Sequence, residues 1–521
     1  MKLYWSRDVR EADRIAIEEM GIPSLRLMES AAAAVVDALG TELPERLTGS
    51  VTVLCGRGNN GGDGMAVARL LKGRGVGARV LLAAEPATLS GDGRVQFEKM
   101  EAAAVPWTPA WGEAGPEVLR RSLVESSLAV DALLGTGLSG PARGGVASLI
   151  EVLNTWGGTV AAVDVPSGLS GDALVPFGPA VRADLTLALA LAKPCLFTPE
   201  GAPLCGAVRL LDIGIPQEAV QRLTPVGEAL DLPWAASFGR PRPLGAHKGD
   251  TGRVLLVAGS RGKSGAAVLA ARGALRAGAG LVTVATPASV QPAVAASLPE
   301  AMTLPLPETA EGTLSMDALT PILGFCAQAD ALGMGPGVGG TAETSALMEA
   351  LYAQACLPAV VDADGINAFA GRPGRLAVHA GPRVLTPHPG EMGRVLGMPA
   401  ADVLTGRYGL IPEAAEKAGA VLLLKGYRSL LAAPGRPWRL NLTGGPHMAG
   451  PGFGDVLTGI AAALLGRGEE AYDAASLAAW WHGAAADLAF RRLGGYGLMA
   501  SECADALPEV EGSLRSFRGD R

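Results

Sequence analysis

The first half of the chain alternates short apolar runs with stretches in which apolar residues recur every three or four positions. The run VTVLC at 51–55 is followed by the glycine-rich segment GRGNNGGDG, the helical pattern MAVARLLK and a second run, ARVLL. This order predicts a strand, a glycine loop, a helix and a second strand of a parallel sheet. Further strands are predicted at 128–134, 160–165, 185–191 and 208–213.

Two helices are predicted ahead of this sheet. Ser6 is a suitable cap for a helix that Gly21 stops, and Ser24 starts a second helix that Gly40 closes. The first carries Val9, Ala12, Ile15 and Ala16, and the second carries Leu25, Met28, Ala32, Val35, Val36 and Leu39.

The same rhythm restarts at Arg253 after an irregular stretch. RVLLVAG, SRGKSGAAVLAARGALRAGAG and LVTVATP again predict strand, loop with helix, and strand. Prolines at 225, 233, 241 and 243 indicate a linker. We therefore predict two α/β domains, 1–222 and 223–521. Additional strands are expected at 359–362, 383–386, 421–424 and 429–432, and closing helices at 455–465 and 471–490.

Composition supports a globular enzyme and excludes several other classes. The 521 residues suggest more than one domain at roughly 150 residues each. The net charge of −7, without a run of Lys or Arg, argues against nucleic acid or a membrane surface as partner. No apolar run is long enough to span a bilayer, and the N-terminus resembles no signal peptide. We expect a cytoplasmic protein with reduced cysteines that forms a homo-oligomer.

The first glycine loop invites two interpretations. Gly56, Gly58 and Gly61 satisfy the dinucleotide pattern G-x-G-x-x-G, and Glu85 lies where a ribose-binding acid would follow. Taken alone, this pattern predicts a nicotinamide dehydrogenase. However, the carboxylate of Asp63 stands at the predicted helix start, where it would repel a pyrophosphate. Polar side chains there suit a monovalent cation or the hydroxyl and amide groups of a ligand better.

Three motifs in order resolve this choice by resemblance. GRGNNGGDG, VDALLGTGLSG and VDVPSGL are similar to the NAD(P)H-hydrate epimerase domain, which has a Rossmann-like fold of three αβα layers. The resemblance implies that potassium is bound by Asn60, Asp131 and Ser167, that Asp164 is the catalytic group, and that Lys193 is a further site residue. It implies a substrate pocket lined by Asn59, Asn60, Gly61, Gly62, Asp63, Gly135, Thr136, Gly137, Leu138, Ser139, Gly140, Pro141 and Asp164.

The residues themselves leave simpler readings open. Asp131 and Asp164 end predicted strands and could only cap the turns that follow. The carboxyl ends of parallel strands are nevertheless where open α/β sheets bind ligands. A hydrated nicotinamide carries a hydroxyl on the ring carbon beside nitrogen, so its epimerisation needs acid–base help, for which Asp164 is our candidate.

In the second half, the stretch 441–459 combines glycines with the start of a helix. Gly450, Gly452 and Gly454 run into Asp455, and an apolar helical pattern follows. Free backbone N–H groups and the helix dipole at such a place favour a phosphate. Asp455 is either a helix cap or a base aimed at a hydroxyl. The segment GSRGKS at 259–264 is not a Walker motif, because Val257 stands where that motif needs glycine.

An ordered set of motifs from His247 onward resembles the ADP-dependent (S)-NAD(P)H-hydrate dehydratase domain, which is ribokinase-like. The set includes GMGPGVG, DADGIN, TPHPGEMGR, LLKGYRS and WWHGAAADLAF. The resemblance implies substrate binding by Gly337, His388, Pro389, Gly390, Glu391, Met392, Gly393, Arg394 and Asp455. It implies nucleotide binding by Lys425, Gly426, Tyr427, Arg428, Ser429, Gly445, Pro446, His447, Met448, Ala449, Gly450, Pro451, Gly452, Phe453 and Gly454.

A kinase-like site makes chemical sense for a dehydratase. Hydroxide is a poor leaving group, so Asp455 would deprotonate the hydroxyl while ADP or ATP with magnesium supplies a phosphoryl group. The phosphate then leaves and NADH or NADPH is regenerated. At 451 and 453 the chain has Pro and Phe where the resembling domains commonly have Gly and a hydroxyl residue, so we expect differences in nucleotide contacts.

Two alternatives stay open at this point. A ribokinase-like kinase for a sugar or vitamin precursor, with an accessory domain, would use the same phosphate loop. A nucleotide-sensing scaffold would keep the folds without the chemistry. Asp63, Asp131, Asp164, Lys425 and Asp455 argue against the scaffold, because it would not need this set of charged groups.

Overall fold

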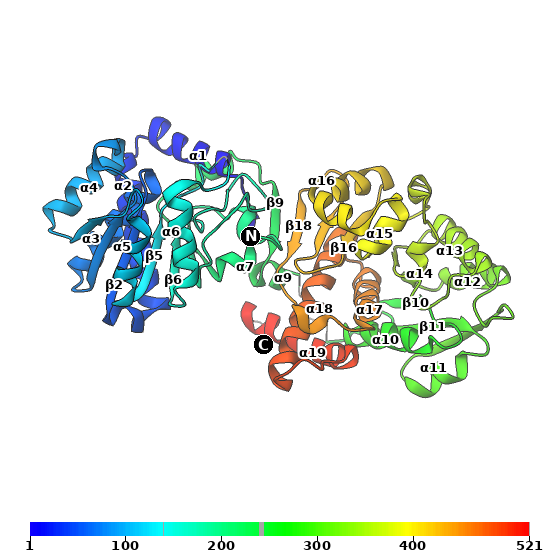
Figure 1. The fold of residues 1–521 in the computed structure, drawn as a ribbon. Helices are drawn as coiled ribbons and strands as arrows, with labels where there is room; N and C mark the ends of the chain where they lie inside the picture. The colour runs from blue at the N-terminus through cyan, green and yellow to red at the C-terminus, as the bar shows by residue number, and fades with distance from the viewer. Residues whose placement is uncertain (139, 239–243, 520–521) are drawn as a thin grey trace. The chain divides into compact units, whose positions relative to one another are not determined.

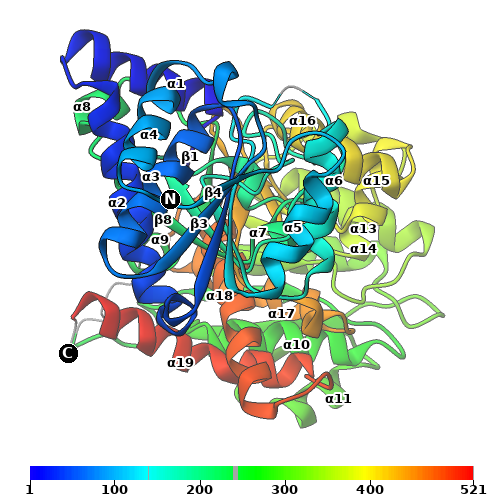
Figure 2. The ribbon, with the colours of Figure 1, turned by 60° about the vertical axis from the view of Figure 1, so that its left-hand side comes forward.

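A computed structural model describes residues 1–138, 140–238 and 244–519. By its internal contacts the chain divides into two compact units, Lys2–Gly227 and Glu228–Arg521, with Met1 joining the second. The predicted linker region therefore contains the division, and it also contains a short strand, β9 (Gly227–Leu230), and a short helix, α9 (Leu232–Ala236). Each unit is built on one sheet of mainly parallel strands (Figures 1 and 2).

The N-terminal unit holds a parallel sheet in the order β4-β3-β2-β5-β6-β7-β8. Its strands are β2 (Ser50–Cys55), β3 (Gly77–Leu82), β4 (Trp107–Pro109), β5 (Ser126–Ala132), β6 (Val160–Val163), β7 (Leu185–Leu189) and β8 (Ala207–Leu211), with β1 (Lys2–Leu3) ahead of them. Its helices are α1 (Ser6–Arg14), α2 (Ser24–Glu42), α3 (Asn59–Gly73), α4 (Gly91–Ala102), α5 (Gly115–Val124), α6 (Gly144–Thr155), α7 (Ala202–Cys205) and α8 (Gln217–Gln221).

Two apolar clusters cover the two faces of this sheet. One joins α2, α3 and α4 to inward residues such as Val53 and Val130, and the other joins α5 and α6 to residues such as Leu54 and Ala129. Neighbours along one strand point to opposite faces, which is why both faces of these strands are apolar. The predicted three-layer αβα arrangement is confirmed.

The C-terminal unit contains the strand order β9-β18-β17-β16-β15-β14-β13-β10-β11-β12. Strands from β10 to β16 pair in parallel, and the hairpin of β17 and β18 extends the sheet in antiparallel fashion. Their bounds are β10 (Arg253–Val257), β11 (Leu281–Pro287), β12 (Met302–Leu306), β13 (Ala331–Met334), β14 (Ala359–Val361), β15 (Arg383–Leu385), β16 (Val421–Leu424), β17 (Leu430–Ala432) and β18 (Trp438–Asn441).

Helices flank this second sheet, and α17 (Phe453–Gly466) packs centrally between α10 (Ser264–Arg276) and α18 (Ala471–Leu493). Close approach of α10 and α17 depends on glycine, because a Cβ on Gly459 would stand 1.9 Å from the Ala270 carbonyl oxygen. The other helices are α11 (Gln291–Ser297), α12 (Leu319–Cys326), α13 (Ala342–Gln354), α14 (Asp364–Asn367), α15 (Pro389–Leu396), α16 (Ala400–Ala418) and α19 (Ala500–Arg518). In the part of the chain that the structure describes, no helix is long and apolar enough to cross a membrane.

Two local predictions need correction. Ser6 is the first helical residue of α1 rather than its cap, which is Trp5, and the Ser6 side chain is buried. The segment Asn59–Asp63, predicted as loop, is the first turn of α3. A Cβ on Gly61 would lie 1.9 Å from the Gly56 carbonyl oxygen, so the glycines let the helix begin directly against the strand end.

Candidate active sites

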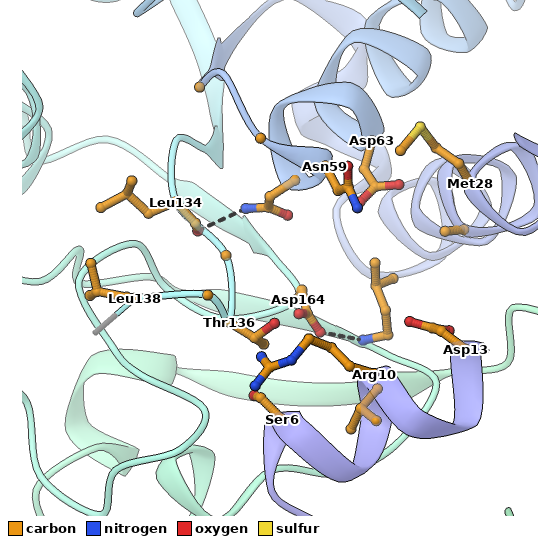
Figure 3. Close-up of a pocket in the computed structure, with 18 of the residues that line it drawn as sticks. Ser6, Arg10, Asp13, Met28, Asn59, Asp63, Leu134, Thr136, Leu138 and Asp164 are labelled. Carbon is orange, nitrogen blue, oxygen red and sulfur yellow. Dashed lines mark hydrogen bonds between the residues drawn. The ribbon is translucent and has the colours of Figure 1, made fainter. Parts of the chain in front are cut away.

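A cavity of about 1030 Å³ lies at the carboxyl edge of the N-terminal sheet. Segments that follow β2, β5, β6 and β7 form one side of it, and α1 and α2 contribute the other (Figure 3). This is the edge at which open α/β sheets bind ligands. The predicted pocket residues Asn59, Asn60, Asp63, Gly135, Thr136, Gly137, Leu138, Gly140, Pro141 and Asp164 all line it.

The remaining predicted pocket residues have other positions. Gly61 and Gly62 are buried in the first turn of α3 and do not line the cavity. Their part is backbone shape, since a side chain at Gly61 would collide with Gly56. Ser139 lies outside the described residues.

Asp164 and Lys193 form a buried ion pair at the floor of this cavity. Asp164 directly follows β6 and adopts φ of 66°, a left-handed conformation that is unusual for a side-chain-bearing residue. Its Oδ1 accepts a hydrogen bond from the Lys193 ammonium and another, of 3.1 Å, from the Leu189 N–H. Lys193 Nζ also donates to the Leu189 carbonyl at 2.8 Å, and its side chain is only 1% exposed. The carboxylate is therefore held rigidly with a charge partner.

Hydrogen bonds through Ser167 and the Leu134 backbone connect the three predicted potassium ligands. Ser167 donates through its backbone N–H to Asp131 Oδ2 at 2.8 Å and through Oγ to Asp131 Oδ1 at 2.6 Å. The Leu134 N–H donates to Ser167 Oγ at 2.8 Å, and Asn60 Nδ2 donates to the Leu134 carbonyl at 2.9 Å. Burial raises the pKa of Asp131 to about 6, while the hydrogen bonds from Ser167 lower it. Amide, hydroxyl, carbonyl and carboxyl oxygens in one place are a suitable ligand set for a hard cation.

Sequence reasoning missed the wall that α1 contributes. Ser6, Arg10 and Asp13 recur at helical spacing and all line the cavity (Figure 3). Burial, together with the charge of Asp164, raises the pKa of Asp13 to about 6, and Lys193 opposes this rise. Burial and the charges of Asp164, Asp13 and Asp92 raise the pKa of Asp63 well above its usual value. The available signal was the polar stripe on this helix.

In the C-terminal unit, Asp455 lies in the first turn of α17 beside a second Lys–Asp ion pair. Lys425, just after β16, donates to Oδ1 of Asp362, just after β14, at 2.5 Å. Asp362 is 2% exposed and also accepts hydrogen bonds from Thr386 at 2.9 Å and Thr458 at 3.1 Å. The parallel strand ends thus bring residues from distant motifs to the start of one helix.

These neighbours shift the pKa of the Asp455 carboxyl. Burial raises its pKa to about 7, the charges of Asp362 and Asp364 add to the rise, and Lys425 opposes it. Burial alone would lower the pKa of Lys425, but Asp362, Glu391 and Asp455 outweigh burial and raise it. Lys425 therefore stays charged, and Asp455 titrates near neutral pH. A carboxyl with such a pKa can exchange protons efficiently.

The predicted HPGE segment has a structural role as well as a position at this site. His388 caps α15, since its Nδ1 accepts from the Gly390 N–H at 3.0 Å, while Glu391 accepts from the His388 N–H at 2.8 Å. Glu391 also approaches Lys425, with 3.7 Å between Oε2 and Nζ. Pro389 opens α15, and Met392, Gly393 and Arg394 continue it, with Met392 and Gly393 buried and Arg394 exposed. The Arg394 side chain donates to Asn367 at 2.8 Å.

The loop containing Gly337 joins this site through Asp364. Asp364 accepts from the Gly339 N–H at 3.0 Å and pairs with Lys263 at 3.2 Å. Gly337 has φ of 62°, and a Cβ there would lie 2.9 Å from the Ala266 side chain. The GSRGKS segment thus contacts the predicted substrate loop although it is no Walker motif.

The predicted nucleotide residues form two loops. In the first, Ser429 Oγ donates to the Gly426 carbonyl at 2.9 Å, Arg428 donates to the Leu442 carbonyl at 2.7 Å, and Tyr427 is exposed. Arg428 has a left-handed φ of 58°. This loop begins at Lys425, so its backbone is fixed next to the ion pair.

The second loop runs from Gly445 to Gly454. Its Pro446–Met448 turn is followed by Ala449, Gly450 and Pro451, which are exposed. His447 stacks on Phe490 with 4.6 Å between ring centroids and lies 3.1 Å from the Asp487 carboxylate. Gly452 precedes α17 with φ of 87°, and the Phe453 side chain is buried. A Cβ on Gly454 would lie 3.3 Å from Asp362 Oδ2 and 3.4 Å from Lys425 Nζ, so the helix start packs directly against the ion pair.

These features define a two-domain α/β enzyme with a separate acid–base site in each unit. Residues 24–195 match the family model described as YjeF-related protein N-terminus, and residues 254–509 match that of NAD(P)H-hydrate dehydratase. The bifunctional NAD(P)H-hydrate repair enzyme of Moorella thermoacetica is 42% identical over 98% of this chain and 96% of its own length. That of Escherichia coli is 32% identical over 98% of this chain and 93% of its own length.

The chain belongs to the family of bifunctional NAD(P)H-hydrate repair enzymes. Among solved structures, it is similar to an ADP/ATP-dependent NAD(P)H-hydrate dehydratase from Bacillus subtilis, with 30% identity and a TM-score of 0.48. That likeness covers 55% of this chain and 99% of the Bacillus chain. The predicted family, a Rossmann-like domain followed by a ribokinase-like one, and the pairing of an isomerase with a lyase are confirmed.

Proposed function

We propose that the two sites act in sequence on hydrated NADH and NADPH. The N-terminal site interconverts the R and S epimers, and the C-terminal site dehydrates the S epimer with ADP or ATP as phosphoryl donor. The observation that carries the proposal is the position of Asp455, in the first turn of α17 and beside the Lys425–Asp362 pair. Phosphate-binding groups and a carboxyl that titrates near neutral pH meet there.

In the C-terminal site, Asp455 takes the proton of the substrate hydroxyl. Lys425 and the N–H groups at the start of α17 stabilise the negative charge of the phosphoryl group in transfer. Asp362, locked by Thr386 and Thr458, positions Lys425. The phosphorylated hydroxyl then leaves as phosphate, which is a better leaving group than hydroxide.

Magnesium fits this site by the chemistry of its donors. Asp364 and Asp455 supply carboxyl oxygens next to the phosphate-binding loop, and magnesium takes such hard oxygen ligands together with nucleotide phosphates. When bound, the ion neutralises charge on the phosphates. The chain contributes by giving the Lys425 ammonium a hydrogen-bond partner of its own, Asp362.

In the N-terminal site, Asp164 is the group that exchanges a proton with the substrate. Its left-handed backbone and the pair with Lys193 direct the carboxylate into the cavity. Potassium fits the oxygen atoms around Leu134, where Asn60, Asp131 and Ser167 meet. A bound potassium ion would supply positive charge near the strand ends. The cytoplasmic location and the homo-oligomeric state stay predictions from the sequence.

One assay tests both activities. A mixture of both epimers of hydrated NADH is incubated with the protein, magnesium, potassium and ADP or ATP, and the absorbance of reduced nicotinamide is followed. Recovery of all the substrate supports both activities, and recovery of only the S fraction supports the dehydratase alone. No recovery, with nucleotide consumed only when a sugar or vitamin precursor is added, would identify a kinase instead.

A further inference from the structure

The cavity of the N-terminal unit contains more carboxyl groups than the proposed epimerase chemistry has used. Asp164, Asp63 and Asp13 line it, whereas the ammonium of Lys193 is the positive group in contact with Asp164. Like charges that are this buried do not ionise together without cost. Burial and mutual repulsion therefore favour the protonated forms of Asp63 and Asp13, and the carboxyl that holds a proton decides how the site exchanges protons.

The geometry separates the three carboxyls. The Asp164 carboxylate already accepts hydrogen bonds from Lys193 and from the Leu189 N–H. Asp63 is buried at the start of α3, where the charges of Asp164, Asp13 and Asp92 all disfavour its ionised form. Asp13 is half-buried on α1. In Figure 3 it lies beside the donor end of the hydrogen bond that Asp164 accepts from Lys193. Asp13 is thus the carboxyl with both access to the cavity and freedom to titrate.

The residues around Asp13 on α1 are mostly polar. Ser6, on the same face of α1, is 0% exposed, lines the cavity, and has a hydroxyl without a hydrogen-bond partner among the described residues. Buried hydroxyls are rarely left unpaired. Arg10, between them, lines the cavity and pairs with Asp172 at 3.0 Å.

We propose that Asp13 is a second catalytic acid–base residue of the epimerisation, acting together with Asp164 from the α1 wall of the cavity. This rests on the proposed function of the site. Inversion at the carbinol carbon requires a bond from that carbon to oxygen or to nitrogen to break, with its electron pair leaving on the heteroatom. If the bond to oxygen breaks, one group protonates the hydroxyl, water leaves and the nitrogen lone pair forms a C=N bond; water then adds to the other face and gives a proton to the second group. If the bond to nitrogen breaks, the nitrogen takes a proton from one group while the hydroxyl gives its proton to the second and becomes a carbonyl; ring closure on the other face reverses both transfers. No further reagent is consumed, but two groups in opposite protonation states are required.

Several charged groups set the pH response of Asp13. Lys193, after β7, favours its ionised form, whereas Asp164, after β6, and Asp63, on α3, disfavour it. Arg10, Arg14 and Glu18 face the cavity from its own helical segment. The net result is a pKa of about 6, so both forms of Asp13 are populated just below neutral pH.

The test uses the full-length protein and one separated epimer of hydrated NADH, without nucleotide, so that only epimerisation proceeds. Chromatography follows the other epimer, with an enzyme-free sample as background. We expect Asp13→Asn to lower kcat about 100-fold and to abolish the change of rate around pH 6, and Asp13→Glu to recover part of the rate. Glu11→Gln, on the exposed side of α1, is the matched control and should retain the rate.

The outcomes distinguish the proposed function of this site from the proposed role of Asp13. If the wild-type protein does not accelerate epimerisation, the proposed function of this site is wrong and this role falls with it. If the wild type is active and Asp13→Asn keeps its rate and pH profile, only the role of Asp13 is overturned. Unchanged ADP-dependent recovery of the S epimer by Asp13→Asn would show that the variant is folded.

Discussion

The two sites of this chain have a similar arrangement of charged groups on different backbone structures. Each has a Lys–Asp ion pair at the carboxyl ends of parallel strands, Lys193–Asp164 in one and Lys425–Asp362 in the other. Each also has a further carboxyl with a raised pKa, about 6 for Asp13 and about 7 for Asp455. Burial near other carboxylates raises both values, and the lysine limits the rise in both.

The difference lies in what surrounds the free carboxyl. Asp455 is in the first turn of a helix of 14 residues, so backbone N–H groups point toward it and toward any phosphate. Asp13 is in the last turns of α1, on a wall of side chains without free N–H groups. The contrast is in the backbone around each carboxyl: Asp455 lies at the start of a helix, whereas Asp13 lies near the end of one.

The largest expected effect is the loss of one activity while the other is kept. Asp455→Asn should reduce ADP-dependent dehydration by roughly 100-fold to 10,000-fold, because a positioned general base contributes that much. Epimerisation should stay at the wild-type rate, measured by chromatography of the two epimers. If the variant still regenerates reduced nicotinamide at the wild-type rate, Asp455 is not the base.

The two ion pairs can be compared by removing each lysine. Lys193→Met and Lys425→Met should each lower the free energy of unfolding of their own unit by about 3–5 kcal/mol, because a buried carboxylate loses its partner. The loss should be larger for Lys425, since Asp362 is 2% exposed and Asp164 is 13% exposed. Urea unfolding measures both.

A double variant provides the control for that comparison. Lys425→Met combined with Asp362→Asn removes both charges, so much of the lost stability should return. Equal destabilisation by the single and double variants would mean that packing of the lysine stem, and not the unpaired charge, is responsible.

The glycine loop of the N-terminal unit offers a smaller, purely steric test. Gly61→Ala should destabilise that unit by about 1–3 kcal/mol, as overpacking does, because its Cβ would stand 1.9 Å from the Gly56 carbonyl oxygen. Gly58→Ala is the matched control, since a Cβ there meets no atom within 4 Å. Thermal unfolding of the two variants should differ, and equal Tm values would contradict the close approach.

The smallest effect expected is a slope of stability with pH. The pKa of Asp455 is raised from 3.8 to about 7, so the folded protein binds more protons than the unfolded chain between these values. Its contribution to stability is therefore present at low pH and is lost as the pH rises toward about 7. Asp455→Asn should flatten this part of the profile in urea unfolding at several pH values. An unchanged slope would mean that Asp455 titrates normally.

Catalysis should show the opposite sign at the same residue. As a base, Asp455 is active when ionised, so kcat/KM for dehydration should rise with pH to a plateau above about 7. In Lys425→Met this rise should move to higher pH, because removing the lysine takes away the charge that limits the pKa of Asp455.

Much of this protein could be predicted from local pattern. The alternation of apolar runs and helical stretches identified the α/β class, and strand β16 was predicted with its observed bounds, 421–424. Motif order gave the family, and most of the pocket residues that it implied do line the N-terminal cavity, because loops after parallel strands share one sheet edge. These properties depend on periodicity and on connections that are close in sequence.

Only the tertiary structure decided which charges meet. No spacing indicates that Lys425 pairs with Asp362 across 63 residues, or that Asp13 on α1 faces the Asp164–Lys193 pair. The first turn of α3 was predicted as loop because glycine is a poor helix former, whereas Gly61 is required by contact with Gly56. Long-range packing fixes burial and charge proximity, and these two quantities set the pKa values on which the chemistry depends.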